Sequence, residues 1–238
     1  IVKRALSNGM LNVSGDYVYN GNDQYLSYVL SDMVDGVQAI HYTDYTVSGD
    51  SGKGAGTYTL TIVATDGGNY SGSVSKTWSI GKRAVTVTGE SDVREYNRYG
   101  HELNGYTVEG LIPGHHFAGL VYSATGIHVG SYLGEFSGTL HIHDMYEIDQ
   151  DDNYEVTLVA GTLDIDPLDI TSASIDLGSV LVYNGQEQSV NIASVSAKGI
   201  IVLTYDVEGN TGTEAGTYTL KVIGTGDYIG EAERTWVI

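Results

Sequence analysis

The sequence has no cysteine, few prolines, few basic residues and no long hydrophobic segment. Its 238 residues include 0 Cys and 2 Pro. Without cysteine there is no disulfide, no thiolate nucleophile and no cysteine-based zinc site. No apolar run approaches the roughly 18 residues that cross a bilayer, so membrane insertion is not expected. Lys and Arg number 11 against 30 Asp and Glu, a formal charge of −19, so nucleic acid is not an expected partner.

The residues that are abundant favour strands. There are 32 Gly and 19 Tyr, and 41% of the residues are hydrophobic. Glycine weakens helix interiors, whereas tyrosine, valine and threonine suit strands. An acidic, cysteine-free chain rich in Gly, Thr and Tyr is also common among secreted bacterial repeat proteins. We therefore expect an all-β protein, and the composition favours an extracellular setting over a cytosolic one.

One pattern recurs along the chain in a fixed order. It consists of an early Tyr-Asn-Gly, a central Ala-Gly-Thr-Tyr-Thr-Leu, an Asn-Tyr or Asp-Tyr, and a closing strand with Thr-Trp. The first copy has these motifs at 19–21, 55–60, 69–70 and 77–78, and the last copy at 183–185, 215–220, 227–228 and 235–236. Such self-similarity is the mark of a repeat architecture.

A more divergent copy lies between these two. The first three motifs have their equivalents at Tyr96-Asn97, 129–133 and Asn153-Tyr154. This copy also has about ten extra residues, which fall at 141–152. We divide the chain into repeat 1 (1–81), repeat 2 (82–166) and repeat 3 (167–238). Residues 1–5 echo the junction at 80–84, which predicts that the chain is cut from a longer array.

Alternation within the repeats predicts strands. Tyr58, Leu60 and Ile62 share one expected face, and the intervening threonines share the other. Gly and Asn clusters supply turns that tolerate positive φ. About seven short strands in each repeat suit a small sandwich. We expect three tandem small Ig-like β-sandwich modules, joined by very short linkers in an elongated arrangement.

These motifs resemble known bacterial repeats. The Ala-Gly-Thr-Tyr-Thr-Leu run resembles the penultimate strand of immunoglobulin-like domains, where a tyrosine anchors the backbone at a corner. The whole pattern is similar to the MBG (mostly β, glycine-rich) and YDG repeats of bacterial surface adhesins. The resemblance implies a stalk or adhesive segment with no catalytic residues to carry over, and repeat 2 departs from it at Arg98 and around 141–152.

The metal-binding candidates lie in repeat 2, which holds six of the seven His and a net charge of −10. His141 and His143 are two apart on an expected strand and so share a face, which makes a transition-metal site conceivable. Asp149, Asp151 and Asp152 offer oxygens to calcium, although the stretch lacks the Gly and Glu of an EF-hand. The competing interpretations are a solvent-facing strand and a hydrated acidic loop.

No catalytic residue is predicted. Gly49-Asp50-Ser51-Gly52 imitates a serine-protease nucleophile loop, but no base, orienting carboxylate or oxyanion hole is evident, and its position before a strand indicates a turn. Most tyrosines fall at repeat-equivalent places and are expected in cores and corners. Tyr42, Tyr45, Tyr96, Tyr99 and Tyr106 form the less regular set, which we expect to be a more exposed binding face.

The sequence predicts a non-catalytic structural and adhesive segment. We expect it to be a monomer whose partners are neighbouring repeats of the same chain and a host or cell-surface glycan or protein. The alternative is a ligand-binding module for a glycan, a protein or calcium, centred on repeat 2. No cofactor beyond calcium is expected.

Overall fold

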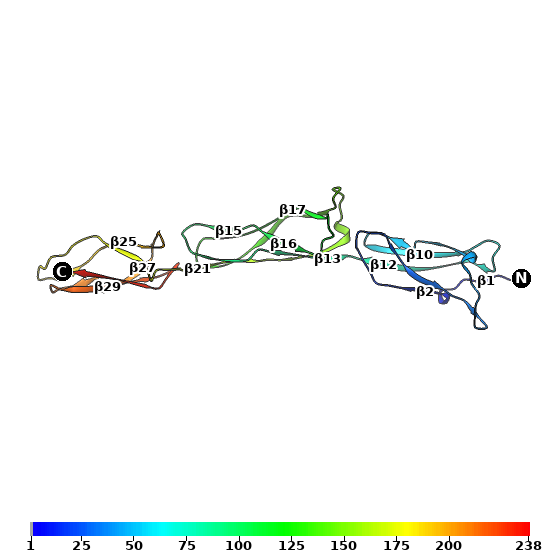
Figure 1. Cartoon of the computed structure of the whole chain (residues 1–238), viewed down its shortest axis with the longest axis horizontal. Helices are drawn as coiled ribbons and strands as arrows, with labels where there is room; N and C mark the ends of the chain where they lie inside the picture. The colour runs from blue at the N-terminus through cyan, green and yellow to red at the C-terminus, as the bar shows by residue number, and fades with distance from the viewer. Residues whose placement is uncertain (1) are drawn as a thin grey trace. The chain divides into compact units, whose positions relative to one another are not determined.

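The computed structural model describes residues 2–238; Ile1, the first residue of the echoed junction, lies outside the described residues. Strands dominate, and the only helical elements in this part of the chain are short 3-10 turns (Figure 1). The predicted all-β class is therefore confirmed. No helix among the described residues is long and apolar enough to cross a membrane.

The chain divides into two compact units. Unit 1 comprises Ile1–Val87, Val108–Leu120 and Gly138–Leu158, and unit 2 comprises Thr88–Thr107, Val121–Ser137 and Val159–Ile238. Repeat 2 therefore contributes segments to both units, and each unit is described by itself.

Repeat 1 supplies most of unit 1. Its elements are β1 (Arg4–Ala5), η1 (Asn8–Met10), β2 (Leu11–Ser14), β3 (Tyr17–Val18), β4 (Gln24–Tyr25), β5 (Ser27–Leu30), β6 (Met33–Val34), β7 (Val37–Gln38), η2 (Tyr42–Asp44), β8 (Tyr45–Ser48), β9 (Ser51–Gly52), β10 (Gly56–Ala64), β11 (Tyr70–Ser71) and β12 (Ser73–Gly81). The largest sheet has the order β3-β12-β10-β8, and β2 pairs with β5. Strands β10 and β12 are antiparallel, with Tyr58 opposite Trp78.

The core of repeat 1 follows the alternation predicted for β10. Leu60 and Ile62 are 0% exposed, whereas Thr57 and Thr59 on the other face are exposed. The Trp78 ring stacks on Tyr58 with centroids 4.9 Å apart. Burying these apolar side chains supplies the main favourable term for this sheet.

Repeat 2 is built from longer strands. Its elements are β13 (Arg83–Gly89), β14 (Asp92–Glu95), β15 (His101–Leu103), β16 (Tyr106–Glu109), β17 (His116–Gly126), β18 (Gly130–Leu133), β19 (Glu135–His143), η3 (Asp151–Asn153), β20 (Tyr154–Val159) and β21 (Thr162–Asp166). Within unit 2, β21 lies between β14 and β18, parallel to the first and antiparallel to the second. The insertion at 141–152 forms the end of β19, a turn and η3 in unit 1.

Repeat 3 lies entirely in unit 2. Its strands are β22 (Leu168–Asp169), β23 (Ser174–Leu177), β24 (Gln188–Ser189), β25 (Ile192–Ala197), β26 (Ile200–Ile201), β27 (Tyr205–Glu208), β28 (Thr211–Gly212), β29 (Thr217–Gly224), β30 (Tyr228–Ile229) and β31 (Glu231–Val237). The sheet β27-β29-β31 repeats the arrangement of β8-β10-β12, and Tyr218 lies opposite Trp236. Leu220 and Val222 are fully buried.

All three repeats contain the tyrosine corner that the resemblance implies. The hydroxyls of Tyr58, Tyr132 and Tyr218 each donate to a backbone carbonyl four residues upstream, at 2.7, 2.8 and 2.8 Å. Each bond ties the strand that carries the tyrosine to the loop before it. The predicted corner role is confirmed in each repeat.

The loop that imitates a protease motif has a structural explanation. Gly49 has φ 73°, and a Cβ there would lie 2.0 Å from the carbonyl oxygen of Thr59. The Gly49 carbonyl accepts the indole N–H of Trp78 at 2.9 Å, as the Gly209 carbonyl accepts that of Trp236 at 3.0 Å. Only glycine suits this backbone and this contact. The motif therefore positions a core tryptophan.

Two of the predictions about tyrosines are wrong. Tyr96, which we expected on an exposed binding face, is 6% exposed, because it packs in the core of unit 2. Tyr183, which we expected in a core, is 53% exposed. Tyr42 and Tyr99 are exposed as expected, whereas Tyr45 and Tyr106 are half-buried.

Candidate functional site

A cluster of aromatic and polar side chains in unit 1 joins repeat 1 to residues of repeat 2. Tyr19, from the Tyr-Asn-Gly motif of repeat 1, meets Tyr154 edge to face, with ring centroids 5.5 Å apart. Both tyrosines are 3% exposed. Edge-to-face pairs add roughly 0.5–1.5 kcal/mol to the burial of the rings. We call this cluster, with Ala55, Gly81 and Asn153, the first junction.

Two hydrogen bonds complete the first junction. The side-chain carbonyl of Asn153 accepts the backbone N–H of Ala55 at 2.7 Å. The backbone N–H of Tyr19 donates to the carbonyl of Gly81, at the end of β12, at 2.9 Å. The second bond continues the parallel pairing in which β3 lies along β12. Tyr19 is thus fixed through both its backbone and its ring.

An equivalent cluster lies in unit 2, where repeat 2 meets repeat 3. Tyr96 and Tyr228 meet edge to face at 5.4 Å, and Asp227 accepts the backbone N–H of Val129 at 2.8 Å. The backbone N–H of Tyr96 donates to the carbonyl of Asp166, at the end of β21, at 2.8 Å. We call these residues the second junction.

The two junctions use the same motifs in the same roles. Tyr96 stands for Tyr19, Val129 for Ala55, and the pair Asp227-Tyr228 for Asn153-Tyr154. The sequence singled out every one of these motifs, but we interpreted them as core and turn elements within single repeats. Their recurrence as a complete set could have indicated a joining role. If each repeat contacts the next one in the same way, then the residues that make the contact must recur in every repeat.

Tyr183 provides an internal comparison. It is the third copy of this tyrosine, and no later repeat lies within the described chain to cover it. It is 53% exposed, against 3% for Tyr19 and 6% for Tyr96. The local turn is nevertheless the same, since Asn184 accepts the N–H of Gln186 at 2.9 Å just as Asn20 accepts that of Asn22. Burial of this tyrosine therefore comes from the junction and not from its own repeat.

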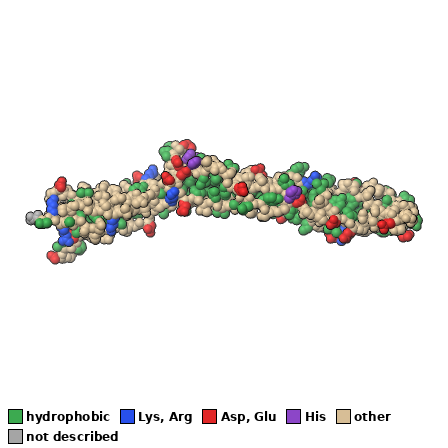
Figure 2. Space-filling model, turned by 180° about the vertical axis from the view of Figure 1, so that it is seen from behind, with side chains coloured by type: hydrophobic (Ala, Val, Ile, Leu, Met, Phe, Trp, Pro, Cys, Tyr) green, Lys and Arg blue, Asp and Glu red, His purple; other side chains and the backbone are tan. Residues whose placement is uncertain are grey.

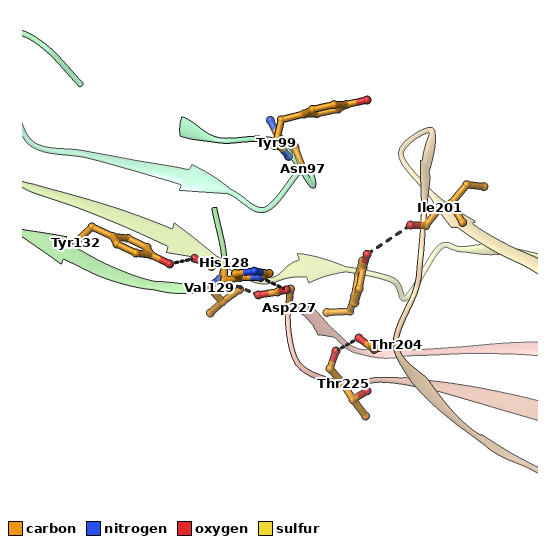
Figure 3. Close-up of polar contacts among 10 residues, drawn as sticks. Asn97, Tyr99, His128, Val129, Tyr132, Ile201, Thr204, Thr225 and Asp227 are labelled. Atoms are coloured by element: carbon orange, nitrogen blue, oxygen red, sulfur yellow. Dashed lines mark hydrogen bonds and ion pairs between the residues drawn. The ribbon is translucent and has the colours of Figure 1, made fainter. Parts of the chain in front are cut away.

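Charge distinguishes the second junction from the first. Figure 3 shows the Asp227 carboxylate between the Val129 N–H and the His128 ring, whose Nδ1 is 2.8 Å from the other carboxylate oxygen. Partial burial raises the pKa of Asp227, but the Val129 N–H and His128 outweigh it, so the pKa lies below its ordinary value. The ionised carboxylate is therefore the favoured form.

The first junction is supported by the acidic insertion. Gln150 accepts the hydroxyl of Tyr19 at 2.9 Å and also the side-chain amide of Asn153, while its own amide donates to Asp144. Burial lowers the pKa of His115, and the His115 Nδ1 is hydrogen-bonded to the Tyr154 hydroxyl at 2.8 Å. The insertion is thus a structural part of this junction, a role that sequence reasoning did not give it.

The predicted transition-metal residues lie in different surroundings. His141 Nδ1 is 2.8 Å from Asp151, a contact that raises the pKa of His141. His143 Nδ1 instead lies 3.4 Å from Glu147. Among residues 2–238, the one group of three close His or acidic ligand atoms is His116, His143 and Glu147. Histidine and acidic side chains lie beside one another on the face shown in Figure 2.

The predicted calcium residues are mostly engaged within the protein. Asp151 accepts the backbone N–H of Ile142 at 2.6 Å in addition to its contact with His141. Asp149 accepts the N–H of Asp151 at 2.8 Å, and Asp152 is exposed in η3. The structure does not gather these three carboxylates into one cluster. Calcium binding by them stays a prediction.

Comparison with known proteins identifies one domain. A model of the MBG domain matches residues 173–238. No curated protein matches the sequence. Among solved structures, the chain is similar to FdeC, an Escherichia coli adhesin, with 11% identity, a TM-score of 0.29 and coverage of 94% of this chain and 95% of that chain. It is also similar to SGBP-B of the Bacteroides ovatus mixed-linkage glucan utilization locus, solved with a mixed-linkage heptasaccharide, with 15% identity, a TM-score of 0.19 and coverage of 100% of this chain and 68% of that chain.

These structural similarities are too low to carry an argument. The family match does not depend on them, and it falls on the repeat in which the motifs Tyr-Asn-Gly, Ala-Gly-Thr-Tyr and Asp-Tyr are all present. The predicted resemblance to MBG-type repeats is therefore confirmed for residues 173–238, which match the model of the MBG domain.

Proposed function

We propose that this chain is a non-catalytic spacer, or stalk, of an adhesin-like bacterial cell-surface or secreted protein. The observation that supports the proposal is that the two junctions are built from the same contacts. Each combines an edge-to-face tyrosine pair, an Asn or Asp that accepts a backbone N–H, and a bond from the tyrosine N–H to the preceding closing strand. Contacts that recur with each repeat join one repeat to the next. A spacer needs such contacts.

The proposal keeps the division into repeats at 1–81, 82–166 and 167–238. Each junction fixes neighbouring repeats through buried aromatic rings and through hydrogen bonds beside them. The linkers are too short to act as free hinges, since Gly81 and Asp166 are themselves hydrogen-bonded in the junctions. The function is therefore to hold successive repeats in a defined relation.

The experiment is 15N relaxation of the full chain, compared with two variants. Asn153→Ala removes the acceptor for Ala55, and Asp152→Ala is the matched control on the neighbouring exposed carboxylate. In the wild type we expect repeats 1 and 2 to tumble together, and we expect Asn153→Ala alone to give them separate correlation times. Independent tumbling of the repeats in the wild type would reject the spacer proposal.

A second candidate, a ligand-binding module, is favoured by one groove in unit 2. The groove has a volume of about 550 Å³ and is lined by His101, Glu102, His128, Tyr132 and neighbouring residues. His101 Nε2 is buried and has no hydrogen-bond partner among the described residues. A sugar hydroxyl would satisfy such an atom.

Titration separates the two functions. A spacer gives no saturable response to mixed glycans, whereas a binding module gives one that His101→Ala abolishes and that exposed His41→Ala, in repeat 1, leaves unchanged. Calcium added in the same series tests the cation form of this alternative.

A further inference from the structure

His116, His143 and Glu147 converge from separate segments of unit 1. His116 begins β17, His143 ends β19, and Glu147 lies in the turn after β19. His116 Nε2 is 3.6 Å from one Glu147 oxygen, and His143 Nδ1 is 3.4 Å from the other. All three ligand atoms lie within 4.8 Å of one another.

These separations suit a metal ion. Two ligand atoms that each lie about 2.0–2.1 Å from a tetrahedral zinc ion are about 3.4 Å apart. Two imidazoles and one carboxylate also make up a set that binds zinc in proteins and leaves one position for water. The exposed side of the cluster, where 72% of the Glu147 side chain is accessible, admits that water.

The turn holds Glu147 in place before any ion binds. The Asp144 carboxylate accepts the backbone N–H groups of Tyr146 and Ile148, and the Glu147 N–H donates to the Asp144 carbonyl at 3.0 Å. Glu147 itself has φ 61°, a backbone conformation that costs a non-glycine residue energy. The turn therefore fixes the backbone from which the Glu147 side chain reaches the two histidines.

We propose that His116, His143 and Glu147 bind a borderline divalent transition-metal ion such as Zn²⁺. Two imidazole ligands favour zinc, copper or nickel over calcium and magnesium, which prefer all-oxygen sets. Repeat 2 has a net charge of −10, which favours any cation. His141 is not among the converging ligand atoms, and its Nδ1 lies 2.8 Å from Asp151 instead.

A bound ion would link the start of β17 to the turn at 144–148. The same turn supplies Asp144, which accepts the side-chain amide of Gln150, and Gln150 accepts the Tyr19 hydroxyl of the first junction. The site is distinct from that junction, and its existence does not rest on the spacer function.

The test is calorimetric titration of the full chain, freed of metal with chelator, with ZnCl₂. We expect one ion per chain. Outer-shell partners of metals are worth about 10- to 100-fold in affinity, so loss of a direct ligand in His116→Ala, His143→Ala or Glu147→Gln should weaken binding by at least about tenfold. His141→Ala is the matched control and should bind as the wild type does.

One further variant separates binding from folding. Glu147→Gly removes the ligand and also relieves the strain of the left-handed backbone. We therefore expect this variant to bind zinc more weakly while its melting temperature stays at least as high as that of the wild type. Absence of saturable binding in the wild type would overturn the proposal. Equal loss in His141→Ala, or no loss in the three ligand variants, would overturn it as well.

Discussion

Asp227 accepts the backbone N–H of Val129 at 2.8 Å, the same contact that Asn153 makes with Ala55 at 2.7 Å. A carboxylate and a carboxamide thus serve one role in two junctions. The carboxylate has a second partner in His128, which the first junction lacks at the corresponding place. The two side chains are therefore separable by mutation and by pH.

Asp227→Ala should lower the free energy of unfolding by about 1–2 kcal/mol. It removes a charge-assisted bond to a backbone N–H from a side chain that is 20% exposed, and so still partly screened by water. Asp227→Asn keeps an acceptor for Val129 and should cost less than about 1 kcal/mol. Urea unfolding followed by circular dichroism measures both, with exposed Asp206→Ala as the control. Equal losses in the Ala and Asn variants would argue against the backbone contact.

The Asp227 carboxylate should also contribute to acid sensitivity. Its pKa is lower in the folded protein than its ordinary value, so its contribution is present above the ordinary Asp range, near pH 4. That contribution is lost as the pH falls through the lower folded pKa. The stability advantage of the wild type over Asp227→Asn should therefore shrink as the pH falls below about 4. Melting temperatures across this range measure the effect, and a constant difference would contradict it.

Arg98→Gly should stabilise the protein by about 0.5–1 kcal/mol. Arg98 has φ 73° at the position where the other repeats have Gly21 and Gly185, at 81° and 74°. The left-handed backbone costs a non-glycine residue about 1–2 kcal/mol. The net gain is smaller, because glycine has more conformational freedom in the unfolded chain and loses more entropy on folding. Urea unfolding of the variant measures the gain. The reverse change, Gly185→Ala, should be destabilising, and a gain in both variants would be inconsistent with this explanation.

Trp236→Ala should cost about 3–5 kcal/mol, as expected for a large buried aromatic side chain. Trp236 is 4% exposed, stacks on Tyr218 at 4.7 Å and donates to the Gly209 carbonyl. Tyr218→Phe removes the hydroxyl that donates to the Glu214 carbonyl and accepts the Glu214 N–H, and it should cost about 1 kcal/mol. Chemical unfolding of both variants gives the two values. Tyr99→Phe, at a 75% exposed ring, is the control and should be near neutral.

The prediction of fold from sequence worked where a contact lies within one repeat. Alternation at 57–62 reveals which side of β10 faces the core, because successive strand residues point to opposite faces. The corner tyrosines and the turn glycines follow from local geometry in the same way. Their roles can be deduced from a short stretch because the partner lies only a few residues away.

The predictions that were wrong, Tyr96 and Tyr183, concern burial that depends on a neighbouring repeat. One motif gives a tyrosine that is 6% exposed in the first case and 53% exposed in the second. The local motif does not reveal the difference in burial, because the ring that covers Tyr96 belongs to Tyr228, far along the chain.

The sequence by itself determined the all-β class, the repeats, the strand faces and the tyrosine corners, since period-two burial and tight turns are local properties. Only the tertiary structure decided that Asn153 and Asp227 join repeats, and that His143 lies beside His116 and Glu147 while His141 pairs with Asp151. His141 and His143 share one face of a strand, as the spacing predicts. Their partners Glu147, Asp151 and His116 lie in a turn, a 3-10 helix and another strand. The positions of these elements depend on how the repeat packs.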